Sequence, residues 1–175
     1  AKAKKVFYAS EPRIESTSRF NSYCGQHESS SATLGCFAPK NLCHEPLPKS
    51  IDRYGCYEIT LFKVQNDQLN GIVDVTAAHE MLHAVYARLD DSERQKVNRM
   101  LAQKGNELSK DDVFKKRMEV YQSLSLEERM DELHSIIGTE VSNLPNDLET
   151  YYRQYFVDRH AVTVLYSNYS EKFSV

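Results

Sequence analysis

Two of the six histidines in this chain flank a glutamate in the stretch "VTAAHEMLHAV", which runs from Val75 to Val85. Residues four apart on an α-helix share one face and lie about 6 Å apart along its axis, so His79 and His83 can both present a ring nitrogen to one metal ion. Glu80 lies about 100° around the helix from His79, within reach of a water molecule on that ion. The pattern predicts a zinc site with its own general base, because zinc keeps an open coordination position and lowers the pKa of bound water.

The alternative is an ordinary helix that carries two packed histidines. A lone histidine on an apolar face is usually a hydrogen-bonded core residue, and His27, His44 and His160 are interpreted in that way. His79 and His83 differ, because the residues around them are mostly valine, alanine, methionine and leucine. A buried carboxylate and two buried imidazoles without partners would carry a large desolvation cost there, and a metal ion removes much of that cost. The pattern therefore favours a metal site.

A catalytic zinc needs three protein ligands, so one ligand must come from outside this helix. "VTAAHEMLHAV" resembles the extended H-E-x-x-H signature of the zincin metallopeptidases, and Tyr86 to Asp90 lack the further histidine of the metzincin branch. In the gluzincin branch the third ligand is a glutamate on a later helix, often within N-E-x-x-S-D. "DELHSIIGTE" resembles that motif at Asp131, Glu132 and Ser135, with aspartate in place of asparagine. The resemblance implies that Glu132 is the third ligand.

The sequence departs from the thermolysin pattern at Ile136, where an aspartate normally orients a ligand histidine. That carboxylate must then come from another residue, and Glu140 is a candidate. Glu140 is also the rival third ligand, since it lies on the same predicted helix, about two turns on and rotated by about 80°. His134 lies about 200° from Glu132, so we interpret it as a surface or packing histidine.

Gluzincins also tend to place a tyrosine, histidine or arginine downstream, where it stabilises the negative charge that develops on the substrate carbonyl oxygen. Such a donor is worth about 3 kcal/mol to the transition state. The last predicted helix offers Tyr151, Tyr152, Tyr155, Arg159 and His160. Aromatic residues at helical spacing usually belong to a core. Among these candidates, Tyr152 and Arg159 are the preferred oxyanion donors.

The chain changes character at about residue 70. Before it, the β-branched or aromatic runs "KVFYA", "ATLGCF" and "CYEITLFKV" are separated by glycine, proline, serine and asparagine, which predicts a small sheet with long loops. After it, the pattern is helical. The first predicted helix is "VTAAHEMLHAVYARL", with Asp74 or Thr76 as its cap. It is apolar on most sides, so we expect it to be buried.

Four further helices are predicted after the buried one. They are "DSERQKVNRMLAQKG" with a stop at Gly105, the charged "SKDDVFKKRMEVYQSL", "SLEERMDELHSIIGTEV" with a capping box of Ser125 and Glu128, and one last helix from Asn146 through "LETYYRQYFVDRHAV". The expected fold is α+β and forms a single domain over residues 1–175. Residues 1–70 form a β-rich upper part, and residues 71–175 form a helical part that carries the zinc site.

In size, the chain resembles the compact gluzincins called minigluzincins. The resemblance implies a zincin-like fold, in which a small sheet lies above an active-site helix and a lower helical part bears the glutamate. In such folds the edge strand just before the active-site helix binds the substrate in extended form. The run "CYEITLFKV" is the candidate for that strand, with its free edge pairing with a peptide.

Composition restricts the partners and the location of the protein. The net charge of −3 provides no basic field, which argues against a nucleic-acid partner. No apolar run approaches the roughly 18 residues that span a bilayer, although the chain could be the soluble part of a membrane-anchored protein. The four cysteines, Cys24, Cys36, Cys43 and Cys56, lack C-x-x-C spacing, which disfavours a thiolate metal site. They favour one or two disulfides and an extracytoplasmic or secreted location, with buried thiols in a cytoplasmic protein as the alternative.

These observations predict a zinc-dependent endopeptidase that acts on a peptide or protein substrate, with one catalytic Zn²⁺ and with Glu80 activating the attacking water. Two alternatives remain open. One is a non-catalytic, zinc-stabilised interaction domain of a membrane-anchored or multidomain protein. The other is a latent zymogen, in which a terminal segment or a cysteine occupies the open position on the metal.

Overall fold

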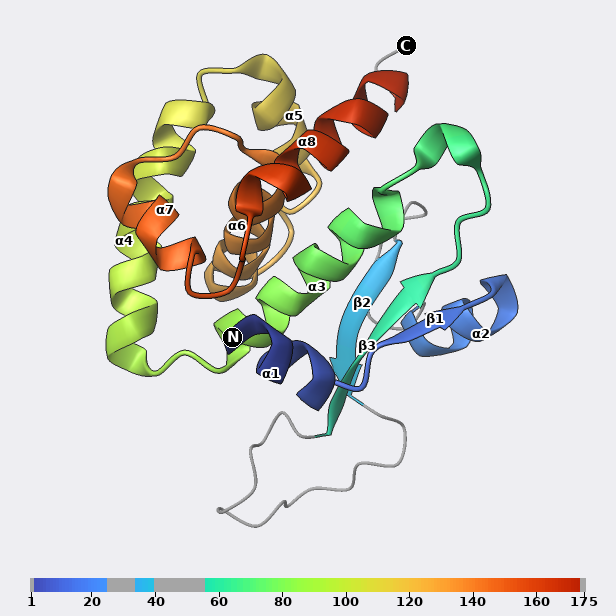
Figure 1. Cartoon of the computed structure of the whole chain (residues 1–175). Coiled ribbons are helices and arrows are strands. Elements are labelled where there is room, and N and C mark those ends of the chain that lie inside the picture. Colours follow the sequence, from blue (N-terminus) through green and yellow to red (C-terminus); the bar gives the residue numbers. More distant parts are fainter. Residues whose placement is uncertain (1, 25–33, 40–55, 174–175) are drawn as a thin grey trace.

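The computed structural model describes residues 2–24, 34–39 and 56–173 (Figure 1). His27, His44 and Cys43, which the sequence interpretation included, lie outside these residues. The fold is mixed α+β, as expected. Its elements are α1 (Lys2–Ala9), β1 (Arg13–Glu15), α2 (Thr17–Cys24), β2 (Gly35–Pro39), β3 (Tyr57–Phe62), the 3-10 helix η1 (Asp67–Leu69), α3 (Ile72–Ala87), α4 (Asp91–Leu108), α5 (Asp112–Glu119), α6 (Leu126–Glu140), α7 (Asn146–Tyr152), α8 (Arg159–Ser170) and the 3-10 helix η2 (Glu171–Phe173).

The three described strands form one small sheet in the order β1-β3-β2. β1 runs parallel to β3, and β2 runs antiparallel to it, with Gly35 opposite Leu61 and Pro39 opposite Tyr57. β3 is therefore the central strand. The prediction that "CYEITLFKV" forms the edge strand beside the active-site helix is wrong, and β2 occupies that place.

The prediction of a strand at "KVFYA" is also wrong, because these residues form the second half of α1. A short apolar run fits a helix as well as a strand, and neighbouring contacts decide between them. Val6 and Phe7 pack against the main core from one side of α1, and the Ser10 amide donates to the Val6 carbonyl at the end of the helix. The region before residue 70 is thus less β-rich than predicted, since it also contains α2.

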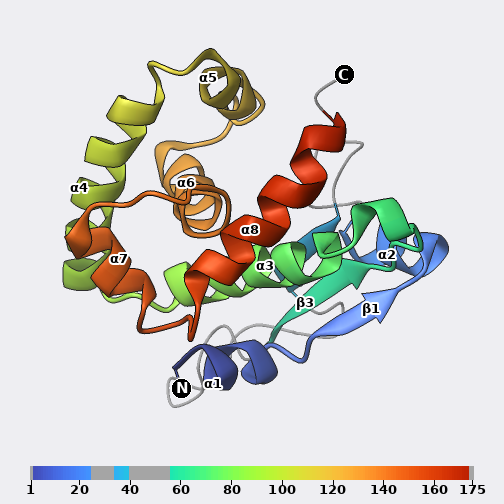
Figure 2. The ribbon, with the colours of Figure 1, turned by 45° about the horizontal axis from the view of Figure 1, so that its top comes forward.

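Helices cover both faces of the sheet. On one face, Ile59 and Leu61 of β3 belong to the main hydrophobic core with residues of α3, α4, α6 and α7. On the other face, Phe20 of α2 packs with the cysteines and Ala38 of a second, smaller core. Both views place α3 between the sheet and the helices α6 and α8 (Figures 1 and 2). The helix with the H-E-x-x-H motif therefore lies at the centre of the fold.

α3 begins one turn earlier than predicted and uses neither Asp74 nor Thr76 as its cap. Its N-cap is Gly71, whose φ of 88° is the left-handed conformation that glycine adopts without strain. The earlier start buries Ile72 and Val75 against Tyr169 of α8. This extra contact explains why the helix begins before its predicted first residue.

Helix boundaries elsewhere follow local chemistry to different degrees. The capping box of Ser125 and Glu128 opens α6 as predicted. α4 continues past Gly105, which lies next to the end of the Leu133 side chain of α6, and ends at Leu108. The charged helix predicted over "SKDDVFKKRMEVYQSL" is shorter, as α5. The last predicted helix is two helices, because the Asp158 side chain accepts from the Ala161 amide and starts α8 as a new helix.

Cysteine pairing agrees with the sequence prediction. Cys24 of α2 and Cys36 of β2 form a disulfide, and Cys56 is also disulfide-bonded. None of these three cysteines can therefore supply a thiolate to a metal, which removes them from the zymogen alternative. In the described residues, no helix has both the length and the apolar character needed to cross a membrane.

Candidate metal centre

The structure brings together the three predicted ligands from two helices. Within the described part of the chain, His79, His83 and Glu132 form the one group of histidine, cysteine or acidic side chains able to hold a metal ion. One potential ligand atom from each lies within 4.8 Å of the other two. α3 supplies both histidines, and α6, which packs along α3, supplies the glutamate. Two histidines and a carboxylate are the donor set of several catalytic zinc sites.

The distances from the histidines to Glu132 are close to those between ligands of one metal ion. Bonds of about 2.1 Å to zinc at tetrahedral angles place neighbouring ligand atoms about 3.4 Å apart. The Nε2 atom of His79 lies 3.6 Å from Oε2 of Glu132, and the Nε2 atom of His83 lies 3.7 Å from Oε1 of the same carboxylate. The two imidazole rings have centroids 4.8 Å apart. The two contacts use different oxygens of Glu132, and the three residues together form a group that could hold a metal ion.

Glu80 follows His79 on α3 and is almost completely buried, with 4% of its surface exposed. It lies under the first residue of β2, since a Cβ atom built on Gly35 would be only 2.9 Å from Oε1 of Glu80. Its negative charge also raises the pKa of His83. Glu80 thus packs against β2 near His83, and its role as the general base stays a prediction.

Asp131 supplies a contact to the site that the sequence interpretation did not assign. Its Oδ1 atom lies 2.8 Å from Nδ1 of His83. A carboxylate at Nδ1 holds the proton on that nitrogen and leaves Nε2, which faces Glu132, with its lone pair available for a metal. Asp131 therefore orients His83, and Glu140, the predicted source of this carboxylate, does not.

The Asp131 contact leads to a testable difference between two variants. We expect Asp131→Ala to weaken zinc binding by roughly 10- to 100-fold, because His83 loses the partner that fixes its orientation. We expect Asp131→Asn, whose side-chain oxygen can still accept from Nδ1, to retain most of the affinity. Competition against a fluorescent zinc chelator measures both values. Equal affinities for Asp131→Ala and the unmodified protein would contradict the orienting role.

The electrostatics of the site favour a charged Glu132. Burial raises the pKa of Glu132. The hydrogen bond with His79 and the charges of His83, His79 and Arg117 have the larger, opposite effect and lower this pKa to about 2. The pKa of His83 also reflects opposing effects, since burial lowers it while Asp131, Glu132 and Glu80 raise it well above its ordinary value. Three carboxylates therefore place negative charge around His83.

Glu140, the rival third ligand, lies outside this group. It is the last residue of α6, and its Oε1 atom lies 3.2 Å from Nη2 of Arg117 on α5. The Tyr166 hydroxyl also hydrogen-bonds to Glu140. The structure therefore favours Glu132 over Glu140 as the ligand and places Glu140 in a contact between α5, α6 and α8.

Tyr152 is fully buried, and its hydroxyl donates to the His134 carbonyl at 2.7 Å. His134 is packed among aromatic rings, and its Nε2 atom lies 2.8 Å from the Tyr151 hydroxyl. Burial, with the charges of His83 and His79, lowers the pKa of His134 to about 3, so it stays neutral. The packing interpretation of His134 is confirmed, whereas the oxyanion role predicted for Tyr152 does not fit this geometry.

Arg159 also has a structural role in place of the predicted oxyanion role. Its side chain is 3% exposed, forms an ion pair with Glu149 at 2.7 Å and donates to the Val141 and Ser142 carbonyls at 2.6 and 2.8 Å. It thereby satisfies carbonyls at the C-terminal end of α6. Of the other three candidates, Tyr151 and Tyr155 pack against each other, and His160 is exposed on α8, contrary to its interpretation as a core residue.

We expect Arg159→Met to lower the free energy of unfolding by about 3 kcal/mol, because it leaves Glu149 and the α6 carbonyls without their donor. Urea unfolding in the presence of a chelator measures this change without a contribution from metal binding. Arg153→Met, at an exposed position after α7, is the matched control and should change the stability by less than about 0.5 kcal/mol. Similar effects of the two variants would contradict the role of Arg159.

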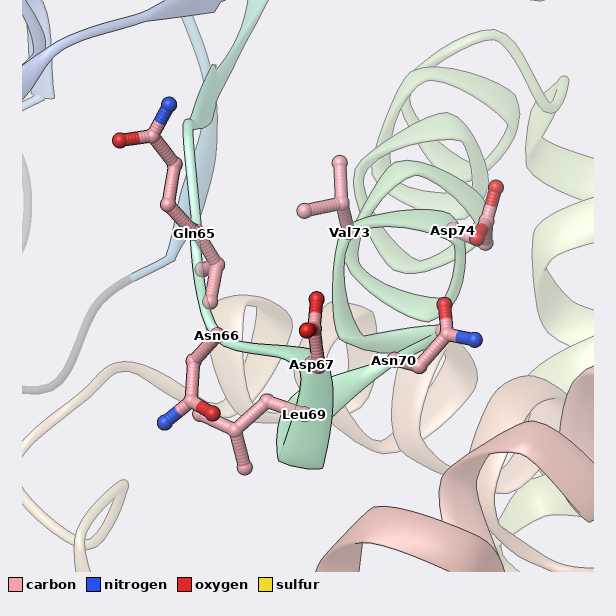
Figure 3. Close-up of a pocket in the computed structure, with 9 residues that line it drawn as sticks. Gln65, Asn66, Asp67, Leu69, Asn70, Val73 and Asp74 are labelled. Carbon is pink, nitrogen blue, oxygen red and sulfur yellow. The ribbon is translucent and has the colours of Figure 1, made fainter.

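A surface pocket of about 370 Å³ lies at the start of α3, away from the histidines. The segment Val64–Asp74, between β3 and α3, supplies its lining residues, and Figure 3 shows Asp67 and Val73 on opposite sides of it. Among the residues that the structure describes, Asp67 and Asp74 form no metal-binding group with a third acidic or histidine side chain. The pocket is therefore separate from the candidate metal centre.

The family resemblance implied by the sequence rests on residues of α3 and α6, which the structure places side by side. A scan against protein-family models finds no match to this chain, and searches of curated proteins and of solved structures find none either.

Proposed function

We propose that the protein is a zinc-dependent endopeptidase. The observation that carries this proposal is the group of His79, His83 and Glu132, whose ligand atoms lie within 4.8 Å of one another beside the buried Glu80. A purely structural zinc site usually has four protein ligands and needs no acidic neighbour. A three-ligand group next to a carboxylate is the arrangement that zinc-dependent hydrolysis uses.

Each residue has a distinct part in this reaction. The two histidines and Glu132 would hold the ion, and Asp131 would keep His83 in the tautomer that can bind it. A zinc ion at this site supplies a Lewis acid that polarises the peptide carbonyl and makes water more acidic. Glu80 accepts the proton of the attacking water and passes it to the leaving amine.

The substrate would pair with the edge strand β2, which lies closest to α3 (Figure 1). The Phe62 amide donates to the Leu34 carbonyl, so Leu34 and every second residue after it direct their backbone groups toward β3. The N–H and C=O groups of Gly35 then point away from β3. An extended peptide pairing there would pass Gly35 directly beside Glu80.

The test is zinc-dependent cleavage by the purified protein. The protein should bind one zinc ion, and mass spectrometry of a disordered protein substrate should reveal new internal termini. Chelation with 1,10-phenanthroline should stop cleavage, and added zinc should restore it. Absence of cleavage across a broad peptide library, with one zinc ion bound, would overturn the proposal.

A second candidate, the zinc-stabilised interaction domain, gains support from one observation. Only 4% of Glu80 is exposed, because β2 covers it. Such a protein would bind zinc with full occupancy, gain stability from it and cleave no peptide. The retained carboxylate beside three ligands favours the endopeptidase.

The location proposed for this activity is outside the cytoplasm or in a secreted protein. The observation behind it is the buried Cys24–Cys36 disulfide, since disulfides persist mainly in oxidising compartments.

A further inference from the structure

Gly35 has no conformational reason to be glycine. It is the first residue of β2, and among the described glycines only Gly71 has a positive φ. Glycine in a strand costs roughly 0.5–1 kcal/mol relative to alanine, and it often marks a close approach by another group. The reason for glycine at this position must therefore be space.

The space beside Gly35 is occupied by α3. A Cβ atom built on Gly35 would lie 2.6 Å from Cγ2 of Thr76, 2.8 Å from Cγ of Glu80 and 2.9 Å from Oε1 of Glu80. All three distances are far shorter than the van der Waals contact of about 3.5–4 Å. Thr76 is fixed because its hydroxyl donates to the Ile72 carbonyl at 2.8 Å, and Glu80 is buried. An added methyl group would have to displace one of these side chains or the strand.

The strand is also fixed. Cys36, the next residue, is bonded to Cys24 of α2, and the two cysteines are 2% and 1% exposed. On its other side, β2 pairs with β3. The backbone at Gly35 thus forms a rigid surface against which the Glu80 side chain packs.

We propose that Gly35 is a positioning residue for Glu80. Because Gly35 has no side chain, the Glu80 carboxylate can pack directly against β2 while Glu80 stays next to His79 on α3. The disulfide keeps this part of β2 in place. This inference rests on the proposed endopeptidase function for its catalytic consequence. The packing contact itself requires neither metal nor activity, so it can be tested separately.

The packing contact is tested by a double-mutant cycle in chelator-treated protein, with the urea midpoint as the readout. Gly35→Ala should lower the midpoint in the protein that contains Glu80. In a Glu80→Ala background, which removes Cγ and Oε1, the same substitution should cause a smaller shift, because only the conflict with Cγ2 of Thr76 remains. Equal shifts in the two backgrounds would overturn the Gly35–Glu80 contact, whether or not the protein is a peptidase.

The catalytic consequence is tested with the zinc-loaded protein. We expect Gly35→Ala to lower kcat roughly 100-fold, since a displacement of about 1 Å at a catalytic group has an effect of that size, while KM and the zinc dissociation constant change by less than about 3-fold. Gly105→Ala, which adds the same methyl group next to the flexible end of Leu133, is the matched control and should leave all three values unchanged.

A double variant keeps the test decisive if Gly35→Ala alone does not fold. Gly35→Ala with Thr76→Ser removes the Cγ2 atom at 2.6 Å and leaves only the conflict with Glu80. It should fold, bind zinc and show the same loss of kcat. Full activity of either variant would overturn the positioning role. An unmodified protein that binds zinc and cleaves nothing would instead overturn the proposed function and leave the urea cycle as the test of the contact.

Discussion

Glu80→Gln should leave zinc binding intact and lower kcat by about 1000-fold. The amide keeps nearly the shape of the carboxylate, so the buried position under Gly35 can be retained. It cannot accept a proton from water, and the loss of a general base typically costs 10²- to 10⁴-fold. Metal content by mass spectrometry and initial rates of peptide cleavage measure the two quantities on the same sample.

The control for this experiment is Glu119→Gln, which makes the same chemical change at an exposed position on α5. It should keep the full rate. Retention of both full zinc occupancy and the full rate in Glu80→Gln would exclude Glu80 as the base. Loss of zinc from Glu80→Gln would show that Glu80 supports the metal site, contrary to its assignment.

The two helices of the site were predictable because their signals are local. The spacing of His79 and His83 sets their common face on any regular helix. The capping box of Ser125 and Glu128 fixes the start of α6, and with it the turn that carries Glu132. The presence of both helices therefore followed from sequence alone, but the start of α3 did not, and the choice of Glu132 came from the family resemblance.

The choice between carboxylates depends on how α6 crosses α3, which no local pattern encodes. Asp131 and Glu140 were both visible on the predicted helix. The packing of the two helices directs Asp131 to His83 and leaves Glu140 at the far end of α6, beside Arg117. The motif contained one useful signal, because Asp131 stands where the thermolysin-like pattern has an asparagine next to the ligand glutamate.

The strand order could have been read more closely from the sequence. All four residues Glu58–Leu61 of β3 are buried, as in a central strand covered on both faces. β2 ends at Pro39, which has no N–H for a ladder and is tolerated at an edge. The prediction of one long last helix was wrong for a comparable reason, because Asp158 is a natural N-cap and a new helix, α8, begins after it.

The substitutions Glu132→Gln and Glu140→Gln separate the two possible third ligands. We expect Glu132→Gln to weaken zinc binding by more than about 100-fold, which is the upper end of the loss from an outer partner of a ligand. Glu140→Gln should keep the zinc affinity within about 3-fold and lower the stability by no more than about 1 kcal/mol, because its partner Arg117 is 46% exposed.

The two variants are matched, because each changes one carboxylate of α6 to an amide. A difference in zinc affinity between them therefore identifies the carboxylate that binds the metal. Isothermal titration with zinc gives the affinities, and urea unfolding in chelator gives the stabilities. The opposite order of zinc affinities would make Glu140 the ligand and require α6 to rotate by about 80° and to shift by about 12 Å along its axis. Such a rotation would also break the contact between Asp131 and His83, so the Asp131→Ala variant would then bind zinc as tightly as the unmodified protein.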